Sequence, residues 1–155
     1  MSTTQTFEFL IQLAVEKRDL AARALAGSQR QAEDAQRKLE MLTQYHRDYL
    51  ARMHSGDVAN ATDLVRMANY RAFTDKLEKA LLQQRRETEA CESYANVCFN
   101  RLQGEARKLK SLQTAHGRRA EEARRGVARF EQKRMDEFAA RAASNGGGKF
   151  DHTVA

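Results

Sequence analysis

The chain has 155 residues, no proline and no tryptophan, and 31% of its residues are charged. Only 7% are aromatic, and alanine supplies much of the 41% hydrophobic share, which leaves little bulk for a thick core and disfavours enzymes with deep pockets. The dominant residue types are good helix formers, and without proline nothing interrupts a long helix. The composition therefore predicts an elongated all-α protein.

The net charge of +6 is concentrated in one stretch. Residues 107–141 hold eleven Lys or Arg against five Asp or Glu, and so carry the whole excess. Cys91 and Cys98 lie two helical turns apart, too far for a disulfide, which favours a reduced, cytoplasmic chain. The N-terminal run 7–15 is far shorter than the roughly 20 apolar residues that span a bilayer. We therefore expect no targeting or membrane-spanning segment.

The first predicted element is a long coiled-coil helix over about residues 4–53. Apolar residues recur there in alternating steps of four and three, whereas an isolated amphipathic helix would drift by about 20° per heptad. The stripe, or seam, comprises Phe7, Ile11, Ala14, Arg18, Ala21, Leu25, Ser28, Ala32, Ala35, Leu39, Leu42, His46, Tyr49 and Met53.

A turn is predicted at 54–60, where Gly56 ends the first helix and Asn60 opens a sequence typical of a helix start. The seam resumes at Met67, which predicts a second helix over about 61–142. Its positions there are Met67, Tyr70, Thr74, Leu77, Leu81, Gln84, Thr88, Cys91, Ala95, Cys98, Leu102, Glu105, Leu109, Leu112, His116, Arg119, Ala123, Val127 and Phe130, with Met135 and Phe138 near its end. Residues 1–143 thus form an antiparallel coiled coil. The glycine run 146–148 predicts a disordered tail over 144–155.

An unpaired C-terminal helix follows from the unequal helix lengths. A short turn makes the helices antiparallel, so the first covers the second only back to about 109–112. The remaining helical turns of the second helix coincide with the basic stretch, yet the apolar side chains of Val127, Phe130 and Phe138 would be exposed to solvent there. This favours a partner groove, a dimer partner or a ring-shaped receptor over a solvated helix end. The interspersed acids disfavour nucleic acid.

The sequence contains no recognisable catalytic, cofactor-binding or metal-binding motif. The four histidines have no partner at metal-ligand spacing, and the sequence contains no phosphate-binding glycine motif and no catalytic triad that two helices could assemble. We expect no enzyme activity, no cofactor and no metal. Cys91 and Cys98 fall on the seam and are predicted to be small core residues.

Large apolar side chains also lie beside the seam near the turn. Tyr45 flanks the seam of the first helix, and Phe73, Leu77, Ala80 and Gln84 form a second stripe on the second helix. A locally wider core would explain them. On periodicity alone that explanation is favoured, and the alternative is a partially exposed aromatic patch that docks a partner protein.

Three motifs resemble the FliJ family, the coiled-coil components of the bacterial flagellar type III export apparatus. They are KLEMLTQYHRDY at 38–49, NYRAF at 69–73 followed by LEKA at 77–80, and KRMDEFAARA at 133–142. The resemblance covers about residues 4–143. It implies an antiparallel two-helix coiled coil similar to the central stalk of rotary ATPases.

The resemblance also implies partners. The open end would insert into the hexameric flagellar export ATPase, FliI, and the flank near the turn would bind the export gate protein FlhA. The family's gate-contacting positions match Leu42, Tyr45, Tyr49, Phe73, Leu77 and Ala80, whereas Lys38 and Gln84 depart from the family's glutamine and histidine. For the ATPase ring we expect Arg118, Arg119, Arg124, Arg125, Arg129 and Phe130.

The implied role is a non-enzymatic stalk that couples the ATPase to the gate and so affects flagellum assembly, motility and chemotaxis. Such a protein would be cytoplasmic and peripheral on the membrane at the flagellar base, held there through its partners. The family is also described as escorting empty export chaperones. The alternative is a generic coiled-coil scaffold or a nucleic-acid-binding helical dimer.

Overall fold

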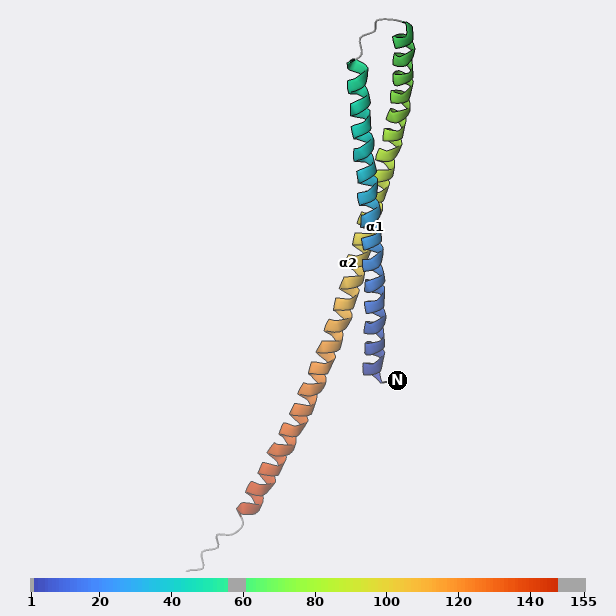
Figure 1. The fold of residues 1–155 in the computed structure, drawn as a ribbon. Helices are drawn as coiled ribbons and strands as arrows, with labels where there is room; N and C mark the ends of the chain where they lie inside the picture. Colours follow the sequence, from blue (N-terminus) through green and yellow to red (C-terminus); the bar gives the residue numbers. More distant parts are fainter. Residues whose placement is uncertain (1, 56–60, 148–155) are drawn as a thin grey trace, which may run out of the picture. The chain divides into compact units, whose positions relative to one another are not determined.

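The computed structural model describes residues 2–55 and 61–147 and contains two helices, α1 (Thr3–His54) and α2 (Ala61–Gly146), with no strand among those residues (Figure 1). The predicted all-α helical hairpin is confirmed. Helix α2 continues past its predicted end near 142, and the Ser144 hydroxyl donates to the Arg141 carbonyl at 2.9 Å within the last turns. Most of the predicted turn and tail, residues 56–60 and 148–155, lies outside the described residues.

Helix α1 begins with a reciprocal cap. The Gln5 backbone N–H donates to the Ser2 hydroxyl at 3.3 Å, and the Ser2 backbone N–H donates to the Gln5 side-chain oxygen at 3.1 Å. This arrangement satisfies two of the N–H groups that a helix start leaves without intrahelical partners. It explains why α1 starts one residue earlier than the apolar periodicity alone predicts.

The chain divides into two compact units, one formed by Gln12–Leu109 and the other by Met1–Ile11 with Lys110–Ala155. Within Gln12–Leu109 the two helices lie side by side (Figure 1). Ring, ion-pair and hydrogen-bond contacts join Tyr49 to Phe73, His46 to Glu78, and Ala35 to Gln84. The partner number rises as the α1 number falls, so the helices are antiparallel.

The seam predicted for this unit is confirmed, because each of its positions is buried or half-buried. On α1 the buried residues are small and recur every seven positions: Ala14, Ala21, Ser28 and Ala35. On α2 they are Thr74, Leu77, Leu81, Gln84, Thr88, Cys98 and Leu109. Cys98 is buried and Cys91 half-buried, both with free thiols. Short side chains on one helix let the two approach closely, which compensates for the lack of bulky core residues.

In the other unit, Phe7 of α1 contacts α2. Its ring centre lies 5.9 Å from that of His116, and the Arg119 guanidinium lies 4.8 Å from the Phe7 ring centre. Coverage of α2 by α1 therefore reaches further than the predicted limit near 109–112, because His116 keeps the seam spacing. From Gly117 to Gly147 every residue is exposed.

Candidate functional site

The six positions matched to the gate-contacting set form the first candidate surface, called here the aromatic flank: Leu42, Tyr45, Tyr49, Phe73, Leu77 and Ala80. Their exposure differs widely. Tyr45 is 51% exposed and Phe73 is 44% exposed, whereas Leu77 is only 7% exposed. Leu42, Tyr49 and Ala80 are half-buried. The flank therefore combines the two alternatives left open by the sequence, since its inner side is core and its outer side faces solvent.

Tyr49 joins the two helices within the flank. Its ring centre lies 4.5 Å from that of Phe73, with 31° between the ring planes, and 5.9 Å from that of Tyr70. The Arg52 guanidinium lies 5.7 Å from the Tyr49 ring centre. Tilted ring pairs at such separations are favourable. Tyr49 thus holds Phe73 in position while part of the Phe73 ring remains accessible.

An open hollow of about 450 Å³ lies at the end of the flank nearer the predicted turn, lined by Tyr49, Arg66, Asn69, Tyr70 and Phe73. The family resemblance did not assign Arg66, Asn69 or Tyr70 to this surface. Asn69 and Tyr70 lie four and three residues before Phe73, and Arg66 lies three residues before Asn69. This spacing places the three side chains near the Phe73 face of the helix, and it was the available signal. The Arg66 guanidinium is 3.8 Å from the Asp63 carboxylate, at the limit of an ion pair.

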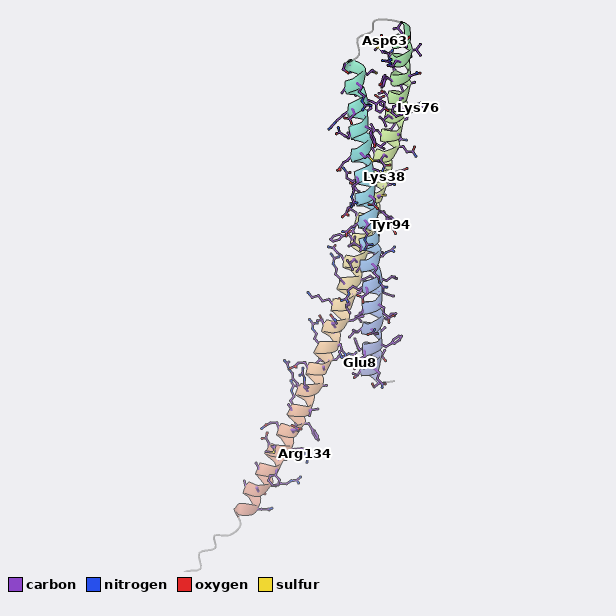
Figure 2. The ribbon with its side chains drawn as sticks, in the orientation of Figure 1. Glu8, Lys38, Asp63, Lys76, Tyr94 and Arg134 are labelled. Atoms are coloured by element: carbon purple, nitrogen blue, oxygen red, sulfur yellow. The ribbon has the colours of Figure 1, made fainter. Side chains whose placement is uncertain are left out.

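The second candidate surface is the exposed C-terminal segment of α2, residues 117–146, on which Figure 2 labels Arg134. Phe130 is 63% exposed and Phe138 is 74% exposed, with Val127 and Met135 exposed beside them in sequence. An open hollow of about 400 Å³ is lined by Glu131, Arg134, Met135 and Phe138. Exposed apolar side chains in such a row are typical of a protein-binding surface.

The arginines expected to bind the ATPase ring are all exposed, but their surroundings differ. Arg124 and Arg125 share the Glu121 carboxylate, at 2.8 Å and 3.2 Å. The Arg119 guanidinium lies on the Phe7 ring. Within the described segment 117–147, Arg118 and Arg129 have no ion pair. These two are therefore the most available cationic side chains of the set.

The described residues contain neither a cluster of metal-ligating side chains nor a membrane-spanning helix. In residues 2–55 and 61–147, no group of three or more His, Cys, Asp or Glu side chains is arranged to hold a metal ion. Over the same ranges neither helix is apolar enough along its length to cross a membrane. What the described surfaces offer is rings, guanidinium groups and apolar side chains, which suit binding to another macromolecule.

Comparison with known proteins identifies the family. The family model described as Flagellar FliJ protein matches residues 3–148. The chain belongs to the FliJ family. A FliJ relative from Salmonella typhi, called Flagellar FliJ protein, is 32% identical over 143 residues, covering 92% of this chain and 97% of the relative. A relative of the same name from Escherichia coli strain K12 is 33% identical over 131 residues, covering 84% and 88%.

In this FliJ-family chain, the two positions that depart from the expected gate-contacting set differ in their surroundings. Lys38 is exposed on α1 (Figure 2). Gln84 is 9% exposed, and its side-chain Nε2 donates to the Ala35 carbonyl of α1 at 3.1 Å. The Gln84 side chain is therefore part of the interface between the helices.

Proposed function

We propose that this FliJ-family chain is a non-enzymatic stalk of the flagellar protein export apparatus that binds the export ATPase hexamer and the FlhA export gate. The observation that carries the proposal is the exposure of Tyr45 and Phe73 beside a buried Leu77. Rings that a packed interface holds in place provide a large contact area at little entropic cost, as hot spots in protein interfaces do. The aromatic flank is accordingly the proposed FlhA-binding surface.

The exposed C-terminal segment is the proposed ATPase-binding surface. Its Phe130 supplies an apolar contact, and Arg118 and Arg129 supply charges that no carboxylate within the described segment neutralises. Arg119, Arg124 and Arg125 belong to the same proposed set. Exposed cationic groups accelerate association with an acidic partner, whereas buried apolar contacts supply most of the affinity. Nucleic acid is not part of the proposal, because acids are interspersed along the segment.

The proposed location is the cytoplasmic face of the membrane at the flagellar base, where the chain is held through its partners. Coupling ATP hydrolysis to the gate would make flagellum assembly, and with it motility and chemotaxis, depend on this chain. Binding of empty export chaperones is a further proposed activity, supported by the family resemblance alone.

A pull-down from extracts of the flagellated bacterium that encodes the chain tests both partners. The wild-type chain should retain FlhA and the export ATPase. Tyr45→Ala with Phe73→Ala should lose FlhA and keep the ATPase, and truncation after Arg119 should lose the ATPase and keep FlhA. Truncating there preserves the residues that contact Phe7.

Leu82→Ala is the matched control, because Leu82 is a large apolar residue of α2 that is half-exposed and lies outside the aromatic flank. It should retain both partners. Retention of both partners by the flank variant and by the truncated chain would contradict the proposal. Self-association that rises with concentration in sedimentation, without capture of either partner, would favour the scaffold or dimer alternative.

A further inference from the structure

The exposed C-terminal segment of α2 carries a row of residues at intervals of three and four, which share one side of the helix. This C-terminal face, all of it exposed, consists of Gly117, Ala120, Arg124, Val127, Glu131, Met135 and Phe138. At 3.6 residues per turn, it lies about a quarter turn around the helix from His116 and Arg119. The contacts that Phe7 makes with those two residues therefore fall on a different side of α2.

A carboxylate lies in the middle of the C-terminal face, among apolar side chains. Glu131 is four residues after Val127, four before Met135 and seven before Phe138. Arg134, labelled in Figure 2, lines the same hollow of about 400 Å³. Within residues 2–55 and 61–147, however, Glu131 forms no ion pair. A cation from outside the chain would therefore find this carboxylate available.

The cation of the same face is Arg124, two helical turns before Glu131. At 1.5 Å per residue the two are about 10 Å apart along the helix, too far to pair within one chain. Arg124 instead contacts Glu121 at 2.8 Å, and Arg125 shares that carboxylate at 3.2 Å. Glu121 would thus keep Arg125 if Arg124 turned to another carboxylate. A cation and an anion two turns apart match the same face of a second helix that runs in the opposite direction.

The size of the side chains selects the same antiparallel alignment. If each charge meets its opposite, the centre of symmetry falls between residues 127 and 128. The levels that then coincide on the two copies are Arg124 with Glu131, Met135 with Ala120, and Phe138 with Gly117. Large side chains therefore lie opposite small ones. In a parallel pair in register, by contrast, Arg124 would meet Arg124 and Glu131 would meet Glu131.

Gly117 supports this alignment independently. A Cβ at this position would meet no atom within 4 Å in its own chain, so packing within the chain does not require glycine there. Glycine inside a helix is less favourable than alanine. Opposite Phe138 of a second copy, the missing side chain leaves room for the ring.

We infer that the C-terminal face binds the C-terminal face of a second copy of this chain, with the two α2 helices antiparallel. The contact runs over residues 117–138, about 30 Å at 1.5 Å per residue. By symmetry it contains two pairs of Arg124 with Glu131, flanked at both ends by apolar layers. A contact between two single helices of this length is small for a stable dimer, so the copies pair reversibly.

The consequence for export rests on the proposed function. Arg124 belongs to the set proposed to bind the export ATPase, and in the pair it is occupied by Glu131 of the second copy. Pairing and ATPase binding therefore compete for the same segment, and the pair is a reserve from which the ATPase takes single chains. Self-association is measured without the ATPase, so the two ideas fail separately.

Sedimentation of the purified full-length chain measures the pairing. The average mass should rise with concentration from the 17.6 kDa of one chain toward twice that value. Arg124→Glu and Glu131→Arg should each weaken association by at least about tenfold, because like charges then meet at both symmetric contacts. A mixture of these two variants should pair again, since every contact between the different chains joins opposite charges.

Arg125→Glu is the matched control, because Arg125 is also exposed and shares Glu121 but lies more than a quarter turn from Arg124. It should pair as the starting chain does. The direction is tested by a short thiol crosslinker with Ala120→Cys and Met135→Cys chains, in a Cys91→Ala, Cys98→Ala background. The mixed chains should be joined between positions 120 and 135.

An average mass that stays at one chain at every concentration would overturn the inference. So would pairing that Arg124→Glu leaves unchanged, or that the mixed charge variants fail to restore, since another surface would then join the copies. Crosslinking of Ala120→Cys to itself and not to Met135→Cys would contradict the antiparallel direction. Pairing without capture of the ATPase would contradict the proposed function alone, and capture without pairing would contradict this inference alone.

Discussion

Tyr45 and Leu77 belong to the same aromatic flank, yet the structure predicts opposite consequences for their replacement by alanine. Leu77 is buried between the helices, and truncation of a buried leucine costs about 2–5 kcal/mol, with the lower end expected in a thin two-helix core. Tyr45 is half-exposed, and its ring has no aromatic partner among the described residues, so its truncation should cost less than about 1 kcal/mol.

Binding to FlhA should respond in the reverse order. If Tyr45 is an anchor of the interface, Tyr45→Ala removes at least about 2 kcal/mol of binding free energy, a reduction of roughly 30-fold in affinity. Leu77→Ala should weaken binding mainly through the fraction of chain that unfolds, so its effect should shrink when the temperature is lowered or an osmolyte stabilises the fold.

Urea unfolding followed by circular dichroism gives the first quantity, and titration calorimetry with detergent-purified FlhA gives the second. Leu82→Ala, half-exposed outside the flank, is the control for both. The reasoning fails if Tyr45→Ala lowers the free energy of unfolding as much as Leu77→Ala does, because Tyr45 would then be a core residue. Unchanged affinity in a stable Tyr45→Ala variant would remove Tyr45 from the interface.

Three further predictions follow from the other contacts. Arg118→Gln with Arg129→Gln should slow association with the export ATPase in stopped-flow measurements at low salt and have little effect at high salt, where screening is strong; a salt-independent loss would argue against steering by charge. Phe7→Ala should speed amide hydrogen exchange in the first turns of α1 and leave the Gln12–Leu109 core protected, whereas uniform deprotection would show a wider structural role. Arg66→Gln should lower FlhA affinity in calorimetry while changing the free energy of unfolding by no more than about 0.5 kcal/mol, and equal affinity would exclude the hollow from the interface.

The helical hairpin could be predicted because its determinants repeat along the sequence. Every position that the alternating steps of four and three select from Ala14 to Met53 is buried or half-buried in α1. The same holds for every seam position of α2 from Met67 to His116. The charged residues Arg18 and Glu105 occupy seam positions and are still half-buried. The overall period, and not the individual side chain, decides which helix face is covered.

The candidate surfaces were less predictable, because exposure depends on small rotations about the helix axis. Leu77 lies on both the seam and the second stripe, and only packing decides that it is buried while Phe73 stays accessible. The Arg119 guanidinium stacks on the Phe7 ring, although the two residues lie more than a hundred positions apart in the sequence. No local sequence pattern predicts such a pair. The contact between Gln84 and Ala35 could not be predicted from the sequence either, because its acceptor is a backbone carbonyl, which every residue possesses.

The segment 117–146 is helical although each of its residues is exposed, and local interactions explain how. Glu121 precedes Arg124 and Arg125 by three and four residues, the orientation in which such pairs stabilise a helix, each by about 0.2–0.5 kcal/mol. The alanine-rich composition and the lack of proline favour the same state. Because local terms maintain the helix, Phe130 and Phe138 are not needed to hold it in place. Their apolar surface is therefore available to a partner at little ordering cost, which is the property that a binding segment requires.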